Sequence, residues 1–134
     1  MEWFMETFGN VPPADYTDFM LSGKNTAYEN FCYDFVNEYG NNDSSDIHYW
    51  FVMNTDKSYE DMIRRYEQAC DNEVIDTDYL PIAEDSGGNL ICLSMNDENY
   101  GKIYFAVHDS EEPTYCYIAN SFTSFLALLY ENEL

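Results

Sequence analysis

The fold is decided by residues 79–107, which read YLPIAEDSGGNLICLSMNDENYGKIYFAV. Three apolar runs, at 80–83, 90–93 and 103–107, are each too short for an ordinary helix. Gly87-Gly88-Asn89 and the polar segment 96–101 separate them, and Gly, Asn and Asp are the residues that let antiparallel strands double back. Apolar runs of this length also fit buried helical segments, but the flanking turn residues favour strands. We therefore predict a three-stranded antiparallel meander against which the rest of the chain packs.

Two short helices are predicted at the start of the chain. The first covers residues 2–8 and is apolar at several positions. The second begins at Pro12-Pro13, since proline suits the first turn of a helix, and ends at Gly23. Its inward stripe is predicted to be Tyr16, Phe19 and Met20.

Strands outside the meander are predicted from alternation and apolar content. Residues 28–36 alternate, which places Phe31, Tyr33 and Phe35 on one face. Residues 47–53 are apolar on both faces, so we expect a central strand there. Residues 40–46 are predicted to form a loop or hairpin turn, residues 108–113 a loop, and residues 114–118 a last short strand.

Two further helices follow from caps and from the 3.6-residue period. The strongest amphipathic pattern spans 58–70, where Ser58 and Asp61 have the spacing of a capping box. A final helix is predicted to be capped by Asn120 or Ser121. Its inward face is predicted to comprise Phe122, Phe125, Leu126, Leu129 and Tyr130.

The composition suits a single folded domain that spans residues 1–134. The formal charge is −21, because 26 Asp and Glu stand against 5 Lys and Arg, and such a balance is typical of disorder. Disordered segments lack aromatic residues, however, whereas this chain has 13 Tyr and 9 Phe. We therefore expect the negative charge to lie on the surface of a folded body with one core.

That surface charge favours one class of partner. An anionic surface repels nucleic acid backbones and anionic membranes, so we expect no direct nucleic acid binding and no membrane binding. Its natural complement is a basic protein, whose capture is accelerated by electrostatic steering. The alternative is that the acidity serves only solubility.

The cysteines give no sign of a metal site or a disulfide framework. Cys32, Cys70, Cys92 and Cys116 are dispersed, with no Cys-x-x-Cys pair and no histidine at ligand spacing. We expect free thiols, no cofactor and a cytoplasmic location, because no secretory signal and no apolar run of membrane-spanning length is present.

Catalytic and ligand-binding interpretations are weaker than structural ones. His108 and Asp109, with Glu111 and Glu112 nearby, could act as an acid/base cluster, and Cys116 could act as a nucleophile. A histidine and acids in a proline-containing turn more often form a solvated loop, and a cysteine in an apolar strand more often lies in the core. We expect no enzymatic activity.

Two other segments invite comparison with known sites. His48 lies between Ile47 and Tyr49 in a predicted strand, so a core or edge histidine is expected rather than a ligand. Residues 85–89 superficially resemble a calcium loop, but they lack the order of an EF-hand, and a hairpin turn is the preferred interpretation.

A series of short motifs resembles the SUKH superfamily, the Smi/Knr-type domains. The motifs occur in order along nearly the whole chain, and the ordered series is more specific than any single one. They are Pro13, Asp15, Tyr16 and Phe19, then Leu80-Pro81-Ile82-Ala83, Asp85 with Gly87-Gly88-Asn89, Gly101-Lys102-Ile103-Tyr104, and Ile118-Ala119-Asn120-Ser121-Phe122 with Phe125-Leu126.

The resemblance implies an α+β fold with a mainly antiparallel sheet and flanking helices. It also implies a binding role, since many bacterial members are immunity proteins that neutralise toxins, often nucleases, and fungal relatives regulate cell-wall synthesis. We expect a cytoplasmic immunity protein that binds a basic toxin of a polymorphic or contact-dependent system. The alternative is a regulatory scaffold or ligand-binding module on the same fold.

The partner is expected to bind acidic and aromatic groups in three segments, at 42–46, 96–100 and 108–112. Tyrosine supplies a rigid contact surface, and carboxylates pair with Arg or Lys. The predicted partner-binding residues are Asp43, Asp46, Asp97, Glu98, Tyr100, Asp109, Glu111 and Glu112.

Overall fold

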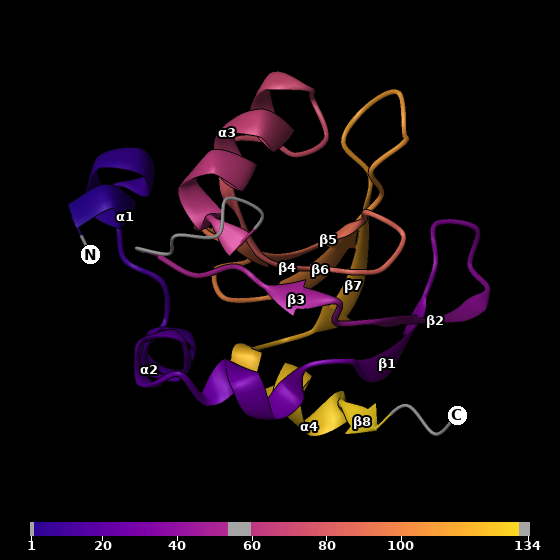
Figure 1. The fold of residues 1–134 in the computed structure, drawn as a ribbon. Helices are drawn as coiled ribbons and strands as arrows, with labels where there is room; N and C mark the ends of the chain where they lie inside the picture. Colours follow the sequence, from indigo (N-terminus) through magenta and orange to yellow (C-terminus); the bar gives the residue numbers. More distant parts are fainter. Residues whose placement is uncertain (1, 54–59, 132–134) are drawn as a thin grey trace.

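The computed structural model describes residues 2–53 and 60–131 (Figure 1). Its helices are α1 (Glu2–Phe8), α2 (Ala14–Ser22), the 3₁₀ helix η1 (Lys24–Tyr28), α3 (Met62–Asp71) and α4 (Phe122–Leu128). Its strands are β1 (Phe31–Val36), β2 (Asn42–Asp46), β3 (Tyr49–Trp50), β4 (Tyr79–Glu84), β5 (Leu90–Ser94), β6 (Ile103–Ala106), β7 (Tyr115–Ala119) and β8 (Tyr130–Glu131). The predicted α+β fold class is confirmed.

The strands of the described residues form two antiparallel sheets. The larger sheet has the order β3-β4-β5-β6-β7, and the smaller one has the order β2-β1-β8. In Figure 1, α3 lies on one side of the larger sheet, and α2, α4 and the smaller sheet lie on the other side. The larger sheet is therefore the middle layer, which explains why β5 is buried along its whole length.

The predicted meander is confirmed as β4, β5 and β6. Its first turn is held by Asp85, which is only 4% exposed. One carboxylate oxygen of Asp85 accepts hydrogen bonds from the backbone N–H groups of Gly87 (3.0 Å) and Asn89 (2.7 Å). The other accepts from the side chains of Asn89 (3.1 Å) and Ser45 (2.7 Å). The turn needs a left-handed residue, which Gly88 supplies at φ +88°.

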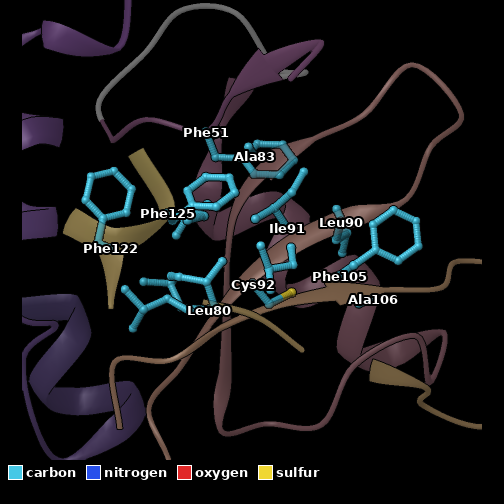
Figure 2. Packing of buried hydrophobic residues seen from close by; sticks show 14 of the residues in the cluster. Phe51, Leu80, Ala83, Leu90, Ile91, Cys92, Phe105, Ala106, Phe122 and Phe125 are labelled. Carbon is cyan, nitrogen blue, oxygen red and sulfur yellow. The ribbon is translucent and has the colours of Figure 1, made fainter. Parts of the chain in front are cut away.

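The core between the two sheets is rich in aromatic rings. Phe35 of β1 stacks on Phe105 of β6 with ring centroids 4.5 Å apart, and Tyr33 lies 5.4 Å from Phe125 of α4. Figure 2 shows Phe125 with Ile91 of β5 among the buried side chains. The alternation predicted for β1 is confirmed at Tyr33 and Phe35, which are both buried. Aromatic pairs of this kind add to the free energy gained from burial alone.

The predictions for residues 40–53 were partly wrong. Residues 42–46 are not a loop but strand β2, which pairs with β1 from Asp46 opposite Cys32 to Asn42 opposite Val36. Residues 47–53 were expected to form a central strand, yet β3 is only two residues long and lies at the end of the larger sheet. The segment is apolar because its side chains are buried although the strand is at an edge: Trp50 packs against Phe19 of α2 and Phe122 of α4, and Phe51 is 1% exposed.

The helix predictions hold with two corrections. The helix predicted over residues 58–70 is α3, which begins at Met62. Its N-cap is Asp61, whose carboxylate accepts hydrogen bonds from the backbone N–H groups of Ile63 (3.1 Å) and Arg64 (3.2 Å). Ser58, the other residue of the predicted capping box, lies outside the described residues. Ser121 is the N-cap of α4, as predicted. The end of this helix was predicted wrongly, because the helix ends at Leu128: Leu129 is its C-cap, and Tyr130 belongs to β8.

Two further properties bear on the site. All four cysteines are free, as predicted. Across residues 2–53 and 60–131, no helix combines the length and the apolar character needed to cross a bilayer.

Candidate partner-binding surfaces

The predicted partner-binding residues lie at two opposite ends of the larger sheet. Because its strands are antiparallel, the β4–β5 and β6–β7 turns share one end and the β5–β6 turn lies at the other. The contact between the first two turns is direct, since the backbone N–H of His108 donates to the side-chain oxygen of Asn89 (3.1 Å). The structure therefore does not bring all three predicted segments into one patch.

The β6–β7 end carries five of the predicted residues. Asp109, Glu111 and Glu112 are exposed in the β6–β7 turn. Asp43 is exposed on β2 and lies close enough to β7 that its charge helps to raise the pKa of the Cys116 thiol, after burial and Glu38.

Asp46 belongs to the same end but has a structural role. One of its carboxylate oxygens accepts hydrogen bonds from the backbone N–H (3.1 Å) and the hydroxyl (2.9 Å) of Ser86. Together with the bond from Ser45 to Asp85, this contact ties β2 to the β4–β5 turn. Asp46 thus fixes the position of the hairpin that presents Asp43.

The opposite end carries Asp97, Glu98 and Tyr100 in the β5–β6 turn. Both acids are exposed. Tyr100 is 39% exposed, and its hydroxyl donates to the backbone carbonyl of Val11, so part of this side chain holds the segment between α1 and α2. This end therefore offers two free carboxylates and one tethered ring.

An open depression of about 580 Å³ lies on the β1–β2 hairpin. It is lined by Asp34, Phe35, Val36, Asn42 and Asp43. Two of these residues are acidic, and Val36 is 51% exposed. A basic and partly apolar side chain of another protein would match both features.

The catalytic interpretation of residues 108–116 gains no support from the geometry. Cys116 is 4% exposed, and burial is the largest cause of its raised pKa. A raised pKa keeps the thiol protonated, whereas the thiolate is the nucleophile. His108 is exposed, with its ring Nδ1 2.7 Å from Asn89 Oδ1. These two residues are therefore a core thiol and a turn residue.

The ligand interpretations are equally weak in the described part of the chain. No group of three or more His, Cys, Asp or Glu side chains there is arranged to hold a metal ion. Both carboxylate oxygens of Asp85 are occupied within the turn, as the hairpin interpretation predicted. His48 is exposed beside the edge strand β3, and its backbone N–H donates to the carbonyl of Glu84 (2.9 Å).

Sequence reasoning missed a layer of tyrosines on the α3 side of the larger sheet. Its rings come from three different strands. Tyr79 belongs to β4, Tyr104 to β6, and Tyr115 and Tyr117 to β7. The side chains of different strands meet only through the register of the strands, so the sequence shows this layer only in part. The signal that could have found them is the i, i+2 spacing of Tyr115 and Tyr117 in a predicted strand.

Comparison with known proteins gives the family. A search of curated proteins and a search of solved structures found no significant match. The model of the SMI1 / KNR4 family (SUKH-1) matches residues 2–128, from α1 to the end of α4. This match covers nearly all of the chain and agrees with the α+β fold described above. The chain is a member of the SMI1 / KNR4 family (SUKH-1), within the SUKH superfamily.

Proposed function

We propose that the protein is an immunity protein that binds and neutralises a basic toxin, such as a nuclease, of a polymorphic or contact-dependent system. The observation that carries the proposal is the match of the SUKH-1 family model to residues 2–128, because many bacterial members of this superfamily have that role. The protein would act without catalysis, in the cytoplasm of the bacterium that makes the toxin.

The charge distribution supports this proposal. Glu38 and Asp43 on the β1–β2 hairpin and the three acids of the β6–β7 turn give one end of the larger sheet an anionic surface. A nuclease needs a cationic surface to bind its substrate, and an anionic protein that covers this surface blocks it. Exposed charges of this kind act mainly on the association rate.

The test is protection of cells. The toxin domain encoded by the neighbouring reading frame is expressed in a heterologous bacterium with and without this protein, and colony counts are compared. We expect growth to be rescued, and rescue to fail with a toxin from an unrelated system.

Failure to rescue, in cells that contain the folded protein, would overturn the proposal. It would favour a regulatory scaffold or ligand-binding module on the same fold. A variant in which Asp109, Glu111 and Glu112 become Asn, Gln and Gln keeps the shape of the β6–β7 turn and removes its charge. Rescue is expected to weaken with this variant.

A further inference from the structure

A second surface of the molecule combines aromatic rings with negative charge. It lies on the α3 side of the larger sheet, on the part of that face that α3 does not cover. It comprises Tyr79, Tyr104, Tyr115 and Tyr117, which we call the tyrosine surface. The register places these side chains on one face, since Tyr79 lies opposite Ser94 on β5, Cys92 lies opposite Tyr104, and Tyr104 lies opposite Tyr117. The other face of these strands forms the core against β1 and α4.

The rings are packed against one another in a fixed arrangement. Tyr79 and Tyr115 are stacked with centroids 4.1 Å apart and planes 13° apart. Tyr104 meets Tyr79 edge-on at 5.7 Å and Tyr117 edge-on at 6.1 Å. Rigid rings lose little conformational entropy when a partner binds, which makes such a surface suited to recognition.

The phenol groups are also held by hydrogen bonds. The hydroxyl of Tyr115 donates to the carboxylate of Asp76 (2.8 Å), and that of Tyr117 donates to the side-chain oxygen of Asn120 (2.6 Å). The side-chain NH₂ of Asn99 donates to the hydroxyl of Tyr104 (2.9 Å). The tyrosine surface is thus organised before any partner arrives.

This surface remains open to solvent. The helix α3 packs against β4, while β6 and β7 lie farther along the sheet (Figure 1). Tyr117 is 48% exposed on β7, the last strand of the larger sheet, and the other three rings are half-buried. A partner can therefore reach Tyr117 directly and the edges of the ring layer beside it.

The charge next to the rings is negative. Asp76 contacts Tyr115, and after burial and the opposing effect of Asn99 the charges of Asp78 and Asp76 help to raise the pKa of Tyr79. The sequence between Glu67 and the β5–β6 turn contains no Lys or Arg, and none follows Lys102. Two cations lie on the same side of the sheet. The backbone carbonyl of Lys102 accepts from the N–H of Ser94 (2.9 Å), so the register places Lys102 beside Tyr79 and Tyr104, whereas Arg65 of α3 is paired with Glu84 (2.9 Å). Asp76 and Asp78 outnumber Lys102 near the rings, so a cation that approaches Tyr115 meets more negative than positive charge.

We propose that the tyrosine surface binds arginine side chains of a basic protein partner. A guanidinium group is planar, stacks on aromatic faces and donates in a fork that matches a carboxylate, so it can use a ring and Asp76 together. Lysine offers a strongly hydrated point charge and cannot stack in this way. The inference rests on the proposed function and deepens it, since it names a second contact surface, in addition to the anionic β6–β7 end, and the residue type that the toxin would place there.

The first experiment needs no toxin. Three nine-residue peptides with alternating Gly and Arg, Gly and Lys, or Gly and Glu are titrated into the folded protein, and the chemical shifts of the tyrosine rings are followed by NMR. We expect the Arg peptide to shift the rings of Tyr104, Tyr115 and Tyr117 more than the Lys peptide, and the Glu peptide to have no effect. Equal shifts with Arg and Lys, or shifts confined to the β1–β2 hairpin, would overturn the inference.

A matched pair of variants tests the surface itself. Tyr117→Ala removes the most exposed ring of the surface, and Tyr39→Ala removes a ring that is 80% exposed on the β1–β2 hairpin. Circular dichroism first establishes that both variants fold. We expect Tyr117→Ala to weaken binding of the Arg peptide about fivefold, which is the size of an exposed cation–π contact. Tyr39→Ala is expected to leave binding unchanged, and the reverse order would contradict the proposal.

The same pair separates this inference from the proposed function. If the unaltered protein rescues cells from the neighbouring toxin and Tyr117→Ala rescues them equally well, the inference fails and the proposed function stands. If the unaltered protein gives no rescue but the Arg peptide still binds the tyrosine surface, the proposed function fails and the surface stands.

Discussion

The substitution Asp85→Ala tests the turn on which the meander depends. It removes a buried carboxylate that accepts four hydrogen bonds, two of them from the backbone N–H groups of Gly87 and Asn89. The side chains of Ser45 and Asn89 can turn to water, but the two backbone groups lose their partners. Gly87 is exposed and Asn89 is half-buried, so water can replace part of this loss. A hydrogen bond to a charged group contributes about 1.5–3 kcal/mol, so we expect the free energy of unfolding to fall by about 3 kcal/mol for the two bonds together.

The measurement is equilibrium unfolding in urea, followed by tryptophan fluorescence, with the slope m checked for two-state behaviour. For a chain of this size, a loss of about 3 kcal/mol should also lower the melting temperature by about 10 °C. Asp85→Asn keeps one acceptor oxygen and should fall between the unaltered protein and Asp85→Ala. Asp97→Ala is the control, since it makes the same charge change at an exposed position and should alter stability by less than about 0.5 kcal/mol. An Asp85→Ala variant as stable as Asp97→Ala would refute the reasoning.

Three further predictions follow from the core. Burial raises the pKa of Tyr16, so the folded state binds more protons than the unfolded state above pH 10. Stability should therefore fall as pH rises beyond that value, and Tyr16→Phe should flatten the fall when unfolding in urea is repeated between pH 8 and 11. Phe125→Ala should lower the free energy of unfolding by about 3–5 kcal/mol, whereas Leu128→Ala, at a position 43% exposed, should change it little. The thiols of Cys92 and Cys116 are buried and their pKa values are raised, so a thiol reagent should label them only when the protein is unfolded.

The elements that could be predicted are those with local causes. The meander depends on Gly, Asn and Asp at its turns, and these residues act within a few positions of themselves. The cap of α4 at Ser121 is equally local, because its hydroxyl accepts from the backbone N–H of Ser124 (3.1 Å). The resemblance to the SUKH superfamily rested on the same turns and caps, which is why it led to the right fold.

The elements that were predicted wrongly depend on contacts between distant residues. Nothing in Asn-Asp-Ser-Ser-Asp favours a strand, yet residues 42–46 become β2 because β1 pairs with them and because Asp46 and Ser45 bond to the β4–β5 turn. Residues 47–53 look central because both of their faces are apolar, but β3 is an edge strand whose Trp50 is buried against Phe19 of α2 and Phe122 of α4.

The candidate surfaces also divide into features with local causes and features that depend on contacts between distant residues. The exposed acids of the β6–β7 turn could be found from the sequence, because charged residues in a loop face water. Two features could not be found in this way: the β5–β6 turn lies at the opposite end of the sheet, and tyrosines of different strands form one layer. Both depend on strand order and register, which no short stretch of sequence determines.

The central claim is that the anionic surface captures a basic protein. The most direct test is the association rate of this protein with the toxin domain of the neighbouring reading frame, made catalytically inactive, measured by stopped-flow fluorescence across a range of salt. Because salt screens attraction between exposed charges, we expect the rate to fall at least tenfold between roughly 0.05 and 0.5 M NaCl, a change that shortens the screening length about threefold. A rate that stays constant across this range would contradict the claim.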